Sequence, residues 1–287
     1  MDHPQRNPSR DGSAPARIDW NEAWRVAREL TGRRAAKESW DQRAPSFAQN
    51  ASKSGYVERM LELMAPAPGC TVLDVGCGPG TLAIPLARKA SSVTALDFSP
   101  RMLELLRGRC AEEGIANVVP VLGSWEDDWA ALGVAPCDVA LASRSLSVVD
   151  LRAALLKLDR FARRRVFLTA PVGEGPIDSR VLRAAGRGYV PGPDYLYPYN
   201  LLQQLGIEAS VAFIPVEDTR RYADLDDALE RLSWMLPDPT ASETEKLRAW
   251  LKRELVQDGP GFRLASPRTV KWAVLSWSKE GRPRSEG

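Results

Sequence analysis

Residues 72–82 read Val-Leu-Asp-Val-Gly-Cys-Gly-Pro-Gly-Thr-Leu, a short apolar run that leads into a glycine-rich turn. The run predicts a buried β-strand, and the residues from Thr81 to Ala87 predict a helix after it. Gly76, Gly78 and Gly80 carry no Cβ atom, so the backbone can take positive φ values and approach a ligand closely. A strand, a glycine turn and a helix in this order form an element that cradles nucleotides.

The details of the turn indicate which nucleotide it binds. The dinucleotide fingerprint Gly-x-Gly-x-x-Gly/Ala would place Gly or Ala where this chain has Thr81, which disfavours an NAD-binding protein. The spacing Asp-x-Gly-x-Gly-x-Gly over residues 74–80 instead resembles the first motif of class I S-adenosylmethionine-dependent methyltransferases. In that family the early carboxylate helps to position the amino-acid moiety of the cofactor. The resemblance implies S-adenosylmethionine as the cofactor, with its methionine end held mainly by the backbone of Asp74, Gly76, Cys77 and Gly78.

A second carboxylate follows at the expected distance. The apolar run from Val93 to Asp97 predicts a strand that ends in an acid, and Asp97 lies 21 residues beyond Gly76. A carboxylate at this place can accept hydrogen bonds from both ribose hydroxyl groups, in NAD enzymes and in methyltransferases alike. The resemblance implies that Phe98 and Met102 lie beside the adenosine.

The segment from Asn117 to Asp127 predicts a third strand followed by a polar turn. In many class I methyltransferases the residues after this strand contact the adenine, so the resemblance implies that Ser124 and Trp125 border the ring. The partner of the adenine N6 group stays open among Ser124, Glu126 and a backbone carbonyl.

A fourth apolar run, from Cys137 to Ser143, is typical of a strand covered on both faces. It would deliver Ser143 and Arg144 to the carboxyl edge of the sheet, where ligands of open α/β folds bind. The resemblance implies that Ser143 lies near the methyl donor, and Arg144 is a candidate for contact with the acceptor. The Asn/Asp-Pro-Pro-aromatic motif typical of adenine-N6 methyltransferases is absent from this segment.

Two aromatic segments each allow two interpretations. The segment from Trp40 to Phe47 resembles a Trp-Asp-x-x-Ala-x-x-aromatic stretch that folds over the cofactor pocket in many small-molecule methyltransferases, and packing of a helix onto the sheet explains it equally well. As a lid, it would bring Phe47 to the cofactor and Trp40 to the acceptor. Further along, a proline-rich stretch either covers the sheet edge or lines the acceptor pocket with Tyr195, Tyr197 and Tyr199.

The resemblance implies an α/β fold: a Rossmann-like, seven-stranded, mostly parallel sheet flanked by helices, with the last strand antiparallel. The composition then divides the chain into four parts. We expect a disordered tail over residues 1–17, an N-terminal helical lid over 18–65, the methyltransferase domain over 66–278 with residues 171–209 as an inserted cap or substrate segment, and a frayed tail over 279–287.

Composition limits the remaining functions. The chain has 287 residues, 44% of them hydrophobic, and a net charge of +2, which provides no basic field for nucleic acid. Its four cysteines are dispersed and its one histidine, His3, stands in the N-terminal tail, so we expect reduced thiols and no metal site. No apolar run approaches the length of a membrane span, which favours a cytoplasmic protein. Trp20 and Trp24, four residues apart, predict packing against the domain or against a partner chain. A homodimer is possible.

The motifs favour transfer of a methyl group from S-adenosylmethionine to a small-molecule acceptor, with the catalytic residues unknown. The chain resembles the type-11 methyltransferases found among ubiquinone and menaquinone biosynthesis enzymes and their small-molecule relatives. The alternatives are a methyltransferase that acts on a protein or RNA, an NAD(P)-binding oxidoreductase, and a cofactor-binding regulatory protein without turnover.

Overall fold

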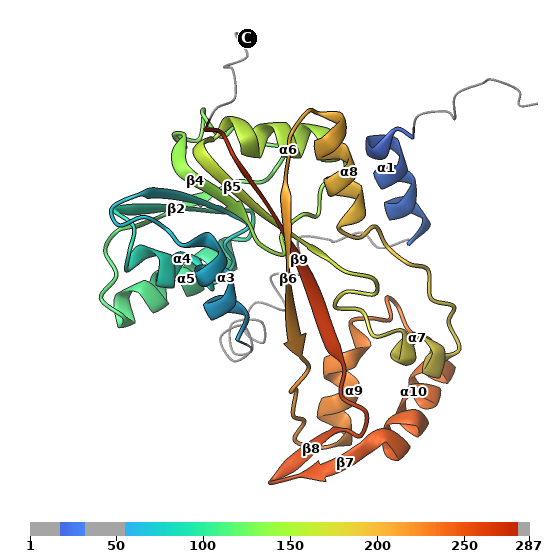
Figure 1. The fold of residues 1–287 in the computed structure, drawn as a ribbon. Coiled ribbons are helices and arrows are strands. Elements are labelled where there is room, and N and C mark those ends of the chain that lie inside the picture. Colours follow the sequence, from blue (N-terminus) through green and yellow to red (C-terminus); the bar gives the residue numbers. More distant parts are fainter. Residues whose placement is uncertain (1–17, 32–54, 281–287) are drawn as a thin grey trace, which may run out of the picture.

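The computed structural model describes residues 18–31 and 55–280 and contains a seven-stranded sheet in the order β3-β2-β1-β4-β5-β9-β6 (Figure 1). The strands are β1 Thr71–Val75, β2 Ser92–Asp97, β3 Val118–Leu122, β4 Cys137–Ala142, β5 Ala162–Pro171, β6 Ser210–Glu217 and β9 Thr269–Ser278. β1 to β5 pair in parallel, whereas β9 runs antiparallel to both β5 and β6. The predicted fold class, with its antiparallel last strand, is confirmed.

Helices cover both faces of this sheet. On one face lie α3 Tyr56–Met64, α4 Ala83–Ala87 and α5 Pro100–Glu112, and on the other lie α1 Trp20–Leu30, α6 Leu151–Arg160 and α8 Leu196–Gln204 (Figure 1). Because successive side chains of a strand point to opposite faces, Trp272 and Trp277 of β9 join different cores, as their odd spacing predicts. The central strands are therefore buried on both sides, which explains their continuous apolar sequences.

The helix after β2 begins at a side-chain cap. Ser99 has an extended backbone, its side-chain oxygen accepts a hydrogen bond from the Met102 N–H, and Pro100 occupies the first turn. This cap fixes the direction in which the chain leaves Asp97, so the residues after β2 return along the sheet as α5.

A second, smaller lobe extends from one end of the sheet (Figure 1). It consists of α7 Ser179–Ala185, α9 Leu225–Ser233, α10 Ala241–Glu254 and the hairpin of β7 Leu255–Asp258 and β8 Gly261–Leu264. These elements bury a separate apolar core that includes Val181, Leu232 and Leu251. The predicted insertion over residues 171–209 is divided in the structure: α7 belongs to this lobe, and α8 packs against α1 and α6.

The N-terminal helix α1 packs on the sheet domain. Trp24 is buried and its indole N–H donates to the Val148 carbonyl at 2.9 Å. Trp20 and Trp24 both make edge contacts with Tyr197 of α8, with centroid distances of 5.6 and 6.3 Å. Of the two predicted alternatives, packing against the domain or against a partner chain, these contacts show the first.

Cys70, Cys77, Cys110 and Cys137 are buried, and none of them forms a disulfide in the structure. Within residues 18–31 and 55–280, the structure has no helix of the length and apolar character needed to cross a membrane.

Candidate functional site

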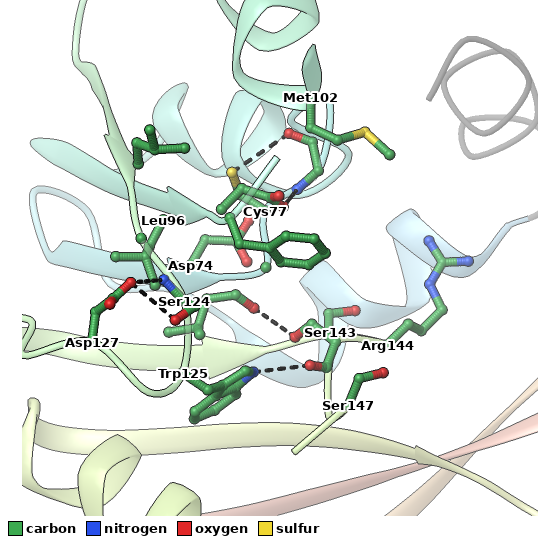
Figure 2. A pocket seen from close by; sticks show the side chains of 18 of the residues that line it. Asp74, Cys77, Leu96, Met102, Ser124, Trp125, Asp127, Ser143, Arg144 and Ser147 are labelled. Atoms are coloured by element: carbon green, nitrogen blue, oxygen red, sulfur yellow. Dashed lines mark hydrogen bonds between the residues drawn. The ribbon is translucent and has the colours of Figure 1, made fainter. Parts of the chain in front are cut away.

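A cavity of about 710 Å³ opens at the carboxyl ends of β1, β2 and β4 (Figure 2). Ten residues predicted to contact the cofactor line it together: Asp74, Gly76, Cys77, Gly78, Asp97, Phe98, Met102, Ser124, Trp125 and Ser143. Arg144, predicted as an acceptor contact, lines the same cavity. Phe47 and Trp40 lie outside the described residues. The carboxyl ends of neighbouring strands meet at one edge of the sheet, where ligands of open α/β folds bind. Residues that are far apart in the sequence therefore lie together at this cavity.

The glycine turn after β1 forms the floor of the cavity. Gly76 has φ 71° and Gly78 has φ 54°, both in the left-handed region that favours glycine. A Cβ atom on Gly76 would lie 2.3 Å from the Cβ of Ser145, whose hydroxyl donates to the Val75 carbonyl at 2.6 Å. The turn therefore needs glycine at position 76 both for its backbone conformation and for its contact with the end of β4.

Asp97 connects the turn to the end of β2. Its Oδ2 accepts a hydrogen bond from the Gly78 N–H at 2.8 Å, and its Oδ1 accepts one from the Ser99 N–H at 2.9 Å. The side chain is buried but lines the cavity. Since each carboxylate oxygen can accept more than one hydrogen bond, Asp97 can hold the turn and also accept from a ligand.

Asp74 lies beneath the turn and is 2% exposed. The Ala83 N–H donates to its carboxylate, whereas Oδ2 has no hydrogen-bond partner in the described part of the chain. Burial, and then the negative charge of Asp97, raise the pKa of Asp74 to about 7. An unsatisfied buried carboxylate oxygen beside a cavity is a site where a cationic group of a ligand would be stabilised.

Cys77 lies between Gly76 and Gly78 in the turn. Its thiol is 4% exposed and lies 3.5 Å from the Gly78 carbonyl oxygen, to which it donates. Burial and the nearby carboxylates of Asp74 and Asp97 raise the pKa of the Cys77 thiol well above its usual range. Such an environment favours the protonated thiol, whereas the nucleophilic form of cysteine is the thiolate.

The opposite wall is built from the turn after β3. The Asp127 Oδ2 accepts hydrogen bonds from the backbone N–H and the hydroxyl of Ser124, at 2.7 and 2.9 Å. The Trp125 indole donates to the Ser145 carbonyl at 2.9 Å, and the Lys157 ammonium donates to the Trp125 carbonyl at 2.6 Å. These bonds hold Trp125 at the cavity wall, where its aromatic ring provides an apolar surface.

A side-chain hydrogen bond joins the residue after β4 to α3, the helix that precedes the glycine turn in the chain. The hydroxyl groups of Ser143 and Tyr56 share a hydrogen bond of 2.7 Å, and the Tyr56 hydroxyl also donates to Thr169 Oγ1 at 3.3 Å. Tyr56 is fully buried and comes from α3. It was not singled out from the sequence, because a tyrosine at the start of a short helix carries no motif and its contact with Ser143 spans 87 residues.

The three tyrosines predicted as acceptor contacts lie elsewhere. Tyr195 makes an edge contact with Phe213 of β6, and Tyr197 packs against Trp20 and Trp24. Tyr199 packs against the core on the face that α1 covers. None of them is among the described residues that line the cavity, so their contact with an acceptor stays a prediction.

Sequence comparisons agree with this geometry. A family model described as a methyltransferase domain matches residues 72–164, which include the glycine turn and Asp97. A Haemophilus influenzae protein described as uncharacterized is 35% identical over 242 residues, which cover 83% of this chain and 88% of that protein. The chain belongs to the class I S-adenosylmethionine-dependent methyltransferases. Its cofactor is S-adenosylmethionine, so the interpretation as an NAD(P)-binding oxidoreductase finds no support.

Two further similarities fit the same family. The ubiquinone biosynthesis O-methyltransferase of Xylella fastidiosa strain 9a5c is 27% identical to this methyltransferase over 199 residues, which cover 68% of this chain and 70% of that enzyme. The crystal structure of the YcgJ protein from Bacillus subtilis covers 79% of this chain and 98% of its own, with a TM-score of 0.52 and 14% identity. The second similarity concerns the fold alone.

Replacing Gly76 with alanine tests the contact between the glycine turn and β4. We expect Gly76→Ala to lower the free energy of unfolding by about 1–3 kcal/mol and to weaken S-adenosylmethionine binding, because the new Cβ would overlap Ser145 at a positive φ. Gly108→Ala is the matched control, since Gly108 lies in α5 with no atom within 4 Å of its added Cβ. Denaturant unfolding and calorimetric titration measure both effects. Equal behaviour of the two variants would contradict the assignment.

The raised pKa of Asp74 predicts a pH dependence of stability. A carboxyl group with a pKa of about 7 in the folded protein and an ordinary value of 3.8 in the unfolded chain favours folding when protonated. Its contribution is fully present below about pH 4 and is lost as the pH rises through about 7. We expect Asp74→Asn to remove this loss, so that without cofactor the variant is more stable than the wild type at pH 8, by on the order of 1–4 kcal/mol.

Denaturant titrations of the cofactor-free protein between pH 5 and pH 8 measure this difference. Glu58→Gln is the control, because Glu58 is exposed on α3. If wild type and Asp74→Asn lose stability in parallel over this range, the carboxyl of Asp74 has no raised pKa.

Proposed function

We propose that this enzyme transfers the methyl group of S-adenosylmethionine to a small-molecule acceptor in the cavity after β1, β2 and β4. The observation that carries the proposal is the unsatisfied Oδ2 atom of Asp74 beneath a glycine turn that approaches the cavity with its backbone. S-adenosylmethionine has an ammonium group and a sulfonium centre, both cationic. A buried carboxylate that lacks a partner fits the ammonium group, because the pair removes the cost of an isolated buried charge.

The remaining contacts follow the shape of the cavity. Asp97 would accept hydrogen bonds from the ribose hydroxyl groups, while Phe98 and Met102, which follow it in the chain, would lie beside the adenosine. Ser124 and Trp125 on the opposite wall would border the adenine. The Ser124 hydroxyl donates to Asp127, which favours Glu126 or a backbone carbonyl over Ser124 as the partner of the adenine N6 group.

The chemistry requires little from acidic or basic side chains. Bound S-adenosylmethionine supplies a methyl group that is already activated by its sulfonium centre. The protein's part is to hold the acceptor in line with that group, and such positioning supplies much of the acceleration of a transfer reaction. Ser143, fixed by Tyr56 at the end of β4, would border the place where the acceptor meets the donor.

Three observations favour a small acceptor over a macromolecule. The cavity of about 710 Å³ has the size of a small-molecule site. The net charge of +2 provides no strong attraction to nucleic acid. The similar enzyme from Xylella fastidiosa is named for the biosynthesis of ubiquinone, which is a small molecule.

Replacing Asp97 tests the ribose contact. We expect Asp97→Ala to weaken S-adenosylmethionine binding about 10- to 100-fold, because charge-assisted hydrogen bonds contribute about 1.5–3 kcal/mol. Glu58→Ala, which removes an exposed carboxylate of α3, should leave the affinity unchanged. Calorimetric titration measures the affinities, and thermal unfolding checks that each variant is folded. An unchanged affinity of a folded Asp97→Ala variant would show that the ribose lies elsewhere.

The acceptor class is tested by labelling. We expect the enzyme, incubated with methyl-labelled S-adenosylmethionine and a metabolite extract, to produce a labelled small molecule detectable by mass spectrometry. The same incubation with cellular protein and RNA is the comparison. A label that enters protein or RNA and no small molecule would overturn the proposed acceptor class.

A further inference from the structure

Arg144 has an unusual backbone conformation at the edge of the cavity. Its φ of 57° lies in the left-handed region, which residues with a side chain rarely adopt. The Arg144 N–H donates to the hydroxyl oxygen of Thr169 on the neighbouring strand β5, at 2.8 Å, and this bond holds the conformation. Strained backbone that the surrounding structure maintains is concentrated at functional sites. The strained backbone therefore indicates a functional role for the Arg144 side chain.

The guanidinium group of Arg144 is held against aromatic rings. Its central carbon lies 4.2 Å from the centroid of the Tyr56 ring and 5.9 Å from that of Trp272. Tyr56 is itself fixed, because its hydroxyl bonds to Ser143 and Thr169. A planar guanidinium stacked on a ring directs its N–H donors sideways, in the geometry that matches a carboxylate. The arginine side chain is thus oriented before any ligand binds.

The charges around the cavity are divided between two sides. The acidic lining residues are Asp74, Asp97, Glu126 and Asp127, whereas Arg144 is the one lysine or arginine among the described lining residues. Figure 2 shows Asp127 and Arg144 at opposite sides of the cavity, with Ser143 next to Arg144. Burial lowers the pKa of Arg144 because desolvation disfavours its charged form, yet an arginine keeps its charge at neutral pH. A cavity with this arrangement fits a ligand that is cationic at one end and anionic at the other.

We propose that Arg144 binds a carboxylate group in the cavity, as a bidentate anchor beside Ser143. The inference rests on the proposed function, because it places this carboxylate next to the transferred methyl group. Two sources share this chemistry: the amino-acid carboxylate of the cofactor, and a carboxylate of the acceptor. Tyr56 and Thr169 act as positioning residues, since they hold the arginine by its side chain and by its backbone.

Calorimetric titration of Arg144→Met with two probes separates the sources. S-adenosylhomocysteine carries the amino-acid carboxylate, and 5′-methylthioadenosine lacks the whole amino-acid portion. If Arg144 binds the cofactor, Arg144→Met weakens S-adenosylhomocysteine binding about 10- to 100-fold and leaves 5′-methylthioadenosine binding unchanged. Arg144→Lys should recover only part of the affinity, because an ammonium group cannot form the bidentate pair.

The acceptor arm uses the anion-exchange fraction of a metabolite extract with methyl-labelled S-adenosylmethionine. If Arg144 binds the acceptor, both nucleoside affinities stay unchanged and the labelled acidic product falls at least tenfold in Arg144→Met. Arg88→Met, an exposed arginine on the surface, is the control.

Two results would overturn the inference. One is an Arg144→Met variant with unchanged affinities and an unchanged yield of labelled acids. The other is an equal loss of affinity for both nucleosides, which would show that Arg144 only supports the shape of the cavity. Failure of the wild type to bind S-adenosylhomocysteine would instead refute the proposed function, so the two failures are distinguishable.

Discussion

The cavity depends on the absence of a side chain at Gly76. The turn after β1 passes so close to the end of β4 that a Cβ atom would lie 2.3 Å from Ser145, and its φ of 71° favours glycine independently. This close approach lets Ser145 bond to the Val75 carbonyl and receive the Trp125 indole N–H on its own carbonyl. One glycine therefore brings three walls of the cavity together: the β1 turn, the β4 end and the turn after β3.

The same region contains two nearby carboxylates, which is costly without a ligand. Asp97 is satisfied by the amides of Gly78 and Ser99, whereas Asp74 keeps one oxygen unsatisfied and has a pKa of about 7. Folding thus places two carboxylates where the proposed function puts a cationic cofactor, and its binding there would relieve the cost. The cofactor-free protein is thus less stable than a variant without the unsatisfied carboxylate of Asp74 would be, because that carboxylate is placed for a ligand.

The sequence predicted which residues meet at the cavity because they lie at strand ends and carry local signatures. Glycines after β1, Asp97 at the end of β2 and Ser143 after β4 all line the cavity, as the rule for parallel sheets requires. Tyr56 was missed because its role depends on a tertiary contact with Ser143 that no local pattern encodes. The proline-rich segment with Tyr197 allowed two interpretations from the sequence, and the structure shows Tyr197 packed against Trp20, so its contact with an acceptor stays a prediction. The division of residues 171–209 between the small lobe and α8 was not predicted, because the core of that lobe joins α7 to helices that follow β6 in the chain.

A crystal structure of the enzyme with S-adenosylhomocysteine tests the central claim most directly. We expect the ribose hydroxyl groups within hydrogen-bond distance of Asp97, the amino group beside Asp74, and the sulfur atom directed toward the end of β4. Density for the ligand outside the cavity, or inside it with the ribose away from Asp97, would contradict the account.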